Sequence, residues 1–206
     1  MTRRDGEDDR HRLNQGADVD GLYVGMNTGL TDVKATAESY INYCYSLGII
    51  AGRGNGKFDP AATVTGNEAA KMLLVAAGYD AQLEGLTGAD WAIKTASLAS
   101  TLGIFDNLSV ATSDPLTRDN AALLIYNALD IEMIQKYENG YAIAFTDHRT
   151  LLSAKYGVYK IEGVVVSNEE AALNNTDSDF ASAKGKTTME NVKVYASTTS
   201  NTTTGE

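Results

Sequence analysis

The feature that most constrains the fold of this chain is an internal repeat. The first copy reads LGIIAGRGNGKFDPAATVTGNEAAKMLL and combines a helix end, a glycine-rich loop and the start of a second helix. Leu47 of this copy aligns with Leu102 at an offset of 55 residues (102 − 47), and Val64 aligns with Leu116 at an offset of 52 (116 − 64). The second copy has therefore lost residues from its loop. A repeat of this length predicts helix-loop-helix units that bury their apolar faces by stacking on one another.

Local signals place the first helix and the loop of the first unit. We expect the helix over about residues 35–47, ended by Gly48, because glycine readily takes the left-handed conformation that closes a helix. Its apolar stripe at helical spacing is formed by Ile41, Cys44, Tyr45 and Leu47. Three glycines of the loop are expected to take positive backbone angles, namely Gly52, Gly54 and Gly56.

Threonine caps predict where the later helices begin. Thr65 and Glu68 have the spacing of a capping box, and Thr87–Asp90 repeats that spacing ahead of Trp91. Thr117 is expected to cap the last helix. The helix after Thr65 is predicted to bury a face made of Ala69, Met72, Leu73 and Ala76.

The sequence changes character after Asp130. Asn139-Gly140 favours a tight hairpin turn between two short strands. A short helix is expected after Asp147, and β-branched residues predict strands within 157–170 and 191–197. This part of the chain therefore reads as the beginning of a β-rich region.

The first copy resembles an S-layer homology module, whose pattern joins a Gly-Ile-Ile turn, a G-x-G-x-F-x-P loop and a second helix that starts T-R-A-E. The second copy, from Trp91 through LGIFDN to PLTRDNAALLIYNAL, resembles the same module with a shortened loop. The resemblance implies non-covalent attachment of an exported bacterial surface protein to anionic cell-wall polysaccharide. It also implies an extracellular location, at the cell wall or in a surface layer.

With this resemblance, the expected fold is mainly α with a β-containing C-terminal part: stacked helix-loop-helix repeats followed by a partial β-rich region. The expected divisions are a disordered charged tail over 1–20, a linker over 21–33 from an upstream repeat, S-layer homology repeats over 34–80 and 81–130, and the β-rich region with a polar C-terminal tail over 131–206.

Composition restricts the partners of the chain. Its 17 basic and 27 acidic residues give a net charge of −10, which argues against nucleic acid as a ligand. The longest apolar runs fall far short of the roughly 20 residues that a membrane span needs, so no membrane insertion is expected. The N-terminus lacks the apolar stretch of an export signal. Since the family is exported, we expect the chain to be a piece of a longer protein.

The motif of the second unit supplies the main candidate for ligand contact. Thr117 and Arg118 match the T-R-A-E motif, whereas Asp119 and Asn120 stand in place of its alanine and glutamate. The resemblance implies that Arg118 contacts the wall polymer, and a guanidinium at a helix N-terminus suits an acidic group. The alternative is that Arg118 pairs on the surface with Asp114 or Asp119. In the first unit Gly66 stands in place of the arginine, which leaves open whether the first groove binds a charged sugar.

Four further residues are candidate glycan contacts. The family has an aromatic residue lining the groove where this chain has Trp91, whose ring can stack on a sugar; the alternative is that Trp91 belongs to the core. The backbone amides of Gly52 and Gly54 could meet a polymer, although the turn itself also needs these residues. Lys57 is either a secondary cation or a solvated loop charge.

No motif for catalysis or cofactor binding stands out. The loop GRGNGKFDP fits neither the calcium-loop spacing nor the phosphate-loop spacing. His11 and His148 have no clustered partners for a metal site. We therefore expect no enzyme, no cofactor and no metal in this chain. Two rival functions remain open: a lattice protein that packs against neighbouring surface-layer subunits without binding glycan, and the anchor of a surface hydrolase.

Overall fold

The computed structural model describes residues 22–34, 37–173 and 182–194. Within them the helices are α2 (Glu38–Ser46), α3 (Gly66–Ala76), α4 (Trp91–Thr101), α5 (Arg118–Ala128) and α6 (Leu151–Tyr156). The strands are β1 (Ile134–Glu138), β2 (Tyr141–Ala144), β3 (Ile161–Ser167) and β4 (Thr188–Val194). The expected order, helices first and short antiparallel strands in the C-terminal part, is confirmed. The predicted tails over 1–20 and beyond residue 194 lie outside the described residues.

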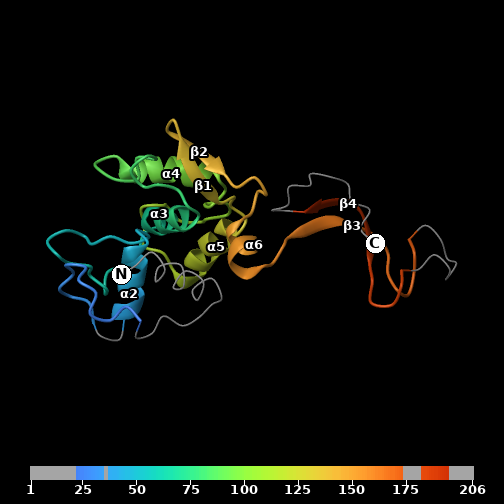
Figure 1. The fold of residues 1–206 in the computed structure, drawn as a ribbon, viewed down its shortest axis with the longest axis horizontal. Helices are drawn as coiled ribbons and strands as arrows, with labels where there is room; N and C mark the ends of the chain where they lie inside the picture. Colours follow the sequence, from blue (N-terminus) through green and yellow to red (C-terminus); the bar gives the residue numbers. More distant parts are fainter. Residues whose placement is uncertain (1–21, 35–36, 174–181, 195–206) are drawn as a thin grey trace.

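One hydrophobic core joins helices α3, α4, α5 and α6, and α3 packs against both α4 and α5. Figure 1 shows α3, α4 and α5 grouped at one end of the molecule. The core consists of Ala70, Leu74, Ala77, Tyr79, Leu86, Ala99, Ile104, Leu124, Ala128, Ile131 and Leu151. Each large apolar side chain buried here contributes about 1.5–3 kcal/mol. Since Ile131 and Leu151 belong to it, the core continues past residue 130.

Two predictions of buried faces need correction. On α3 the fully buried residues are Ala70 and Leu74, one position beyond the predicted Ala69 and Leu73, which are only partly buried. The helix is apolar on most sides, so its sequence pattern does not distinguish the two faces. On α2 only Ile41 of the predicted stripe is fully buried, and Leu47 is exposed. Polar Ser39 and Asn42 are buried instead.

Two of the three predicted threonine caps are confirmed by the structure. Thr65 accepts a hydrogen bond from the Glu68 amide, and the Glu68 carboxylate accepts one from the Thr65 amide, which confirms the capping box of α3. Thr117 accepts from the Asn120 amide at the start of α5. The box predicted at Thr87–Asp90 is wrong, because α4 begins after Asp90 without a side-chain cap.

The starts of α3 and α5 are joined through the segment that precedes α5. The Leu116 amide donates to the Val64 carbonyl (2.8 Å), and the Asn67 amide donates to the Thr112 carbonyl (2.8 Å). A side chain on Gly66 would meet the Thr112 carbonyl oxygen at 2.9 Å from its Cβ. Glycine is therefore required at position 66 for the two units to approach this closely.

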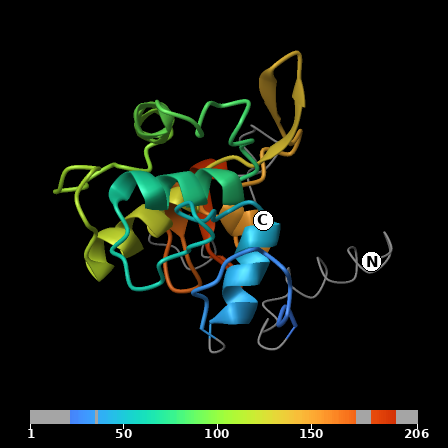
Figure 2. The same ribbon diagram turned by 90° about the vertical axis from the view of Figure 1, so that its left-hand side faces the viewer.

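The predicted hairpin is confirmed. β1 and β2 pair antiparallel around Asn139 and Gly140, whose φ angles of 50° and 83° are those of a tight hairpin turn. The Ile134 amide donates to the Ala77 carbonyl (2.9 Å), so the base of the hairpin is fixed to the end of α3. Figure 2 shows the hairpin projecting from the helical part of the molecule.

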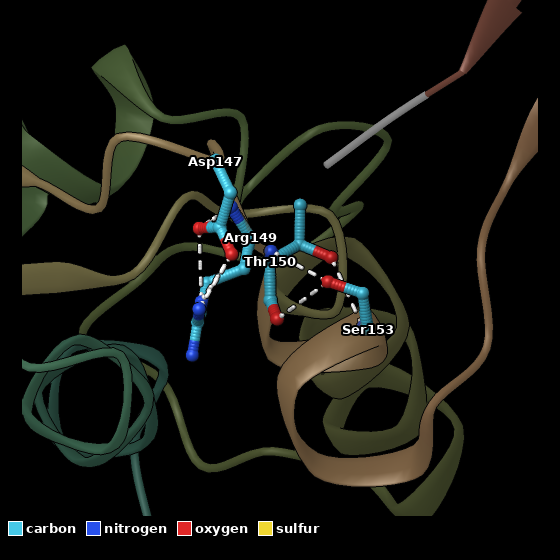
Figure 3. A network of polar contacts seen from close by, with 4 residues as sticks. All are labelled: Asp147, Arg149, Thr150 and Ser153. Carbon is cyan, nitrogen blue, oxygen red and sulfur yellow. Dashed lines mark hydrogen bonds and ion pairs between the residues drawn. The ribbon is translucent and has the colours of Figure 1, made fainter. Parts of the chain in front are cut away.

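A polar network sets the start of α6 (Figure 3). The Thr150 and Ser153 side chains each accept the other's backbone amide, at 3.3 and 3.0 Å. Arg149 forms an ion pair with Asp147, which lowers the pKa of that carboxyl. The Leu151 amide donates to the Ile131 carbonyl, which attaches α6 to the end of the helical core.

The last two strands, β3 and β4, form a separate antiparallel two-stranded sheet. Figure 1 shows it extending away from the helices. Apolar side chains on β3 remain exposed, among them Ile161, Val164 and Val165. The strands predicted from β-branched residues are therefore present, but neither buries a full face against the helical core.

Candidate functional site

A groove of about 930 Å³ runs between the glycine-rich loop of the first unit and the start of α4. Gly52 and Gly54 line it from the loop, and Trp91 lines it from the first residue of α4. Helix α3 contributes Glu68, Lys71 and Met72. The groove therefore brings together three of the residues predicted from sequence, Gly52, Gly54 and Trp91.

The loop side of the groove is a tight backbone turn. The Arg53 amide donates to the Lys57 carbonyl (2.7 Å), and the Lys57 amide donates to the Gly54 carbonyl (3.0 Å). The expectation of a positive backbone angle is confirmed for Gly54 (φ 100°) and Gly56 (φ 65°) but is wrong for Gly52. Gly52 is needed for another reason: a Cβ there would lie 2.9 Å from Leu30 Cδ2 and 3.0 Å from the Lys57 carbonyl oxygen.

Asp32 holds the loop from the segment before α2. Its carboxylate accepts hydrogen bonds from the Phe58 amide (2.8 Å) and the Asp59 amide (2.9 Å). These hydrogen bonds, that of Phe58 foremost, hold the pKa of Asp32 below its ordinary value. The groove wall is therefore fixed by contacts that span more than 25 residues of sequence.

Trp91 shares the groove with a cation that sequence reasoning missed. The Lys71 ammonium lies 5.6 Å from the centre of the Trp91 ring, and burial lowers the pKa of Lys71. Trp91 itself is half-buried, so its ring contributes to the groove wall and not to the fully buried core. A signal for Lys71 existed in the sequence, because it is the single charge within an otherwise apolar stretch of helix.

Arg53 is the second cation in the groove and was also missed. Its guanidinium forms an ion pair with Glu68 (3.2 Å) and donates to the Thr63 carbonyl (3.3 Å). Glu68 accepts from the Thr65 amide as well, so it serves both the helix cap and Arg53. Arg53 is therefore already neutralised by a groove carboxylate.

The remaining predicted residues lie elsewhere. Lys57, Thr117, Arg118 and Asp119 do not line the groove that contains Trp91. Arg118 is exposed at the start of α5, and none of the ion pairs of the described residues joins it to Asp114 or Asp119. The Thr117 hydroxyl is engaged in the helix cap.

The described residues contain neither a metal-binding cluster nor a membrane-spanning helix. No group of three or more histidine, cysteine, aspartate or glutamate side chains in this part of the chain is arranged to hold a metal ion. Among the same residues, no helix is both long and apolar enough to cross a bilayer.

Comparisons with known proteins agree with the geometry of the first unit. The family model of the S-layer homology domain matches residues 29–70. This match covers α2, the glycine-rich loop and the first turn of α3. Residues 29–70 are an S-layer homology domain. The match begins at residue 29, which includes the Asp32 contact to the loop.

Two curated relatives are much longer than the segment that each shares with this chain. A "Cell surface protein" of Thermoanaerobacter kivui is 33% identical over 104 residues, which is 50% of this chain and 13% of the relative. A "Middle cell wall protein" of Brevibacillus brevis is 28% identical over 146 residues, 70% of this chain and 13% of the relative. The alignments thus span about an eighth of each relative. The S-layer homology domain and the names of these relatives indicate a cell-surface or cell-wall location. No solved structure matches the chain.

Proposed function

We propose that this chain anchors a surface protein non-covalently to anionic cell-wall polysaccharide. The observation that carries the proposal is the groove at the edge of the S-layer homology domain, which is lined by Trp91 and by Gly52 and Gly54. Grooves with one aromatic wall and exposed backbone groups suit sugars, because the ring covers the C–H face of a sugar and the amides bind its hydroxyls.

The start of α5 is the second part of the proposed binding surface. Arg118 is exposed there and has no acidic partner among the described residues, so its guanidinium is available to an acidic group of the polymer. Thr117 positions this helix start, Asp119 lies beside Arg118, and Lys57 adds a cation on the loop. A net charge of −10 does not prevent the encounter, because local potential and not net charge governs it.

A second candidate function is assembly with neighbouring subunits of a surface layer. It is favoured by the exposed apolar residues of β3, since exposed apolar patches often mark protein interfaces. The buried Gly66, which replaces the motif arginine, also favours a structural use of the first unit.

The test is co-sedimentation of the whole chain with purified peptidoglycan sacculi, compared with sacculi stripped of polysaccharide by acid. We expect binding to intact sacculi only, and a loss of about tenfold or more in affinity for Trp91→Ala, because stacked aromatic anchors dominate such sites. Tyr126→Ala is the matched control, since Tyr126 is an exposed aromatic residue on α5.

Arg118→Ala gives the second arm of the same test. We expect weaker binding with unchanged thermal unfolding, because Arg118 is exposed and forms no ion pair with the described residues. Equal binding to intact and stripped sacculi would contradict the proposal. Absence of binding together with concentration-dependent oligomers would favour the assembly function instead.

A further inference from the structure

The groove of the first unit lacks the cation that the second unit carries at the equivalent position. Position 66, which aligns with Arg118, is a glycine covered by the Thr112 backbone. Restoring an arginine there is sterically excluded unless the segment before α5 moves. Any anion-binding group of this groove must therefore come from a different backbone position.

Four charged side chains line the groove: Arg53, Asp59, Glu68 and Lys71. Arg53 and Glu68 neutralise each other across 3.2 Å, and Glu68 is further held by the cap of α3. Lys71 differs from Arg53, because no hydrogen bond or ion pair joins its ammonium to an acidic group of the described residues. The groove thus contains one cation whose charge is not compensated by a carboxylate.

The observed partner of the Lys71 ammonium is the Trp91 ring, 5.6 Å away at its centre. A cation–π contact of this kind is weak where water has access. A charge-assisted hydrogen bond to an acidic group at the same place is stronger. An anion that enters the groove can therefore draw the ammonium from the ring, which exposes the ring surface for stacking.

From this geometry we infer that Lys71 is the anion-binding residue of the first groove and that it acts together with Trp91 as a two-part site for an acidic sugar. The acidic substituent of the sugar binds the Lys71 ammonium, and the sugar ring takes the indole surface that the ammonium leaves. This inference rests on the proposed polysaccharide binding. In the first groove, where no motif arginine is present, it assigns the contact with the acidic group to Lys71 on α3.

Asp59 adds a constraint on the ligand. It lines the same groove, and its amide donates a hydrogen bond to the Asp32 carboxylate (2.9 Å). A polymer with acidic groups on every hydroxyl would be repelled by this carboxylate. The site fits a sugar that carries one acidic substituent, either a carboxylate or a phosphate, and free hydroxyls that can donate to Asp59.

The test uses the fluorescence of Trp91, which is the only tryptophan of the chain. The probe is polysaccharide released from Brevibacillus brevis sacculi, used intact, with its carboxyl groups reduced to alcohols, or with its phosphates removed. The variants are Lys71→Met, which keeps the apolar stem without the charge, and Lys71→Arg, which keeps the charge. Lys94→Met is the matched control, because Lys94 is exposed on α4 and does not line the groove.

We expect the wild type to bind the intact polymer with a change in Trp91 emission, and to lose about tenfold in affinity when the relevant acidic group is removed. The reduced and the dephosphorylated polymers identify which acid that is. Lys71→Met should bind the intact polymer about tenfold more weakly and should distinguish it from the neutralised one less than the wild type does, because only Arg118 then remains to contact the acid. Lys71→Arg and Lys94→Met should behave like the wild type to within about threefold.

Two results would overturn the inference and separate it from the proposed function. If Lys71→Met still distinguishes the acidic polymer from the neutralised one as strongly as the wild type, the anion contact lies elsewhere, although polysaccharide binding stands. If the wild type binds neither the released polymer nor intact sacculi, both the inference and the proposed function fail. Thermal unfolding of Lys71→Met should match the wild type within a few degrees, which excludes misfolding as the cause.

Discussion

The starts of α3 and α5 carry the same sequence motif and use it in opposite ways. Both helices are capped by a threonine that accepts the amide three residues on. At the next position α3 has Gly66, which lies beneath the Thr112 backbone, whereas α5 has Arg118, which is exposed. At the third helical position Glu68 completes a capping box and binds Arg53, whereas Asn120 does neither.

This difference shows how a repeat divides its tasks. The first helix start is a packing joint between the two units, so its side chains are committed to the cap, the ion pair and the close backbone approach. At the start of α5 the residue at the equivalent position, Arg118, is exposed to solvent. The same motif can therefore serve structure in one copy and leave an exposed arginine in the next, depending on what packs over it.

The largest loss of stability should come from a side chain at position 66, where the two units approach closely. Gly66→Ala places a methyl group about 2.9 Å from the Thr112 carbonyl oxygen, and Gly66→Arg adds a whole side chain. We expect losses of about 1–3 kcal/mol for the alanine and more for the arginine, because overpacking against backbone cannot relax easily. Arg118→Gly, the reverse exchange, should cost about 1 kcal/mol or less. Urea unfolding measures all three, and equal losses at the two positions would contradict the comparison.

The stability lost on removing each of the two threonine caps should differ by a smaller amount. Thr65→Ala removes one hydrogen bond of the capping box and weakens the hold on Glu68, which predicts a loss of about 1–2 kcal/mol. Thr117→Ala removes a single cap hydrogen bond and should cost about 1 kcal/mol or less. Thermal unfolding of both variants in one buffer gives the ranking. A larger loss for Thr117→Ala would show that α5 depends more on its cap than the structure indicates.

Removing the ion pair of the first unit should have a still smaller effect on stability. The Arg53 side chain is 46% exposed and that of Glu68 is 29% exposed, so solvent screens their attraction. We expect Arg53→Met to lose about 0.5 kcal/mol or less. Lys136→Met, which breaks the more exposed pair with Glu138, is the control. A loss well above about 1 kcal/mol would mean that Arg53 also supports the packing of the loop.

The smallest effect concerns pH. The Phe58 and Asp59 amides lower the pKa of Asp32, so the charged carboxylate contributes stability above the ordinary aspartate pKa of about 4, and this contribution is lost as the pH falls through the lowered value. The stability difference between the wild type and Asp32→Asn should therefore shrink as the pH is taken from about 5 to about 3. Asp147→Asn is the control for the other lowered carboxyl, whose partner is Arg149. A difference that does not change with pH would contradict this role of Asp32.

Local signals were sufficient for much of the fold. The Asn139-Gly140 turn and the Thr65 and Thr117 caps could be predicted because each depends on residues close in sequence. The buried face of α3 was misplaced by one residue, since a helix that is apolar on most sides gives a weak periodic signal. The Thr87 box failed because its spacing is common and nothing in the sequence shows whether the hydroxyl reaches the amide.

The site was harder to predict for the same reason. Trp91, Gly52 and Gly54 line one groove because α4 packs against α3, a tertiary contact that no local sequence pattern predicts. Lys71 and Arg53 belong to no motif, and their proximity to Trp91 and Glu68 depends on that same packing. The burial of Gly66 by Thr112 could not be foreseen either, because the two residues are 46 positions apart (112 − 66). The sequence motifs indicated the family, whereas tertiary packing determines which charged side chains line the groove.

Amide hydrogen exchange of the whole chain, with and without released cell-wall polysaccharide, tests the central claim most directly. If the groove binds the polymer, exchange should slow over residues 48–54 and around Trp91, and it should stay unchanged over β3, residues 161–167. Unchanged exchange in the groove, or slowing confined to β3 and β4, would contradict polysaccharide binding at this site.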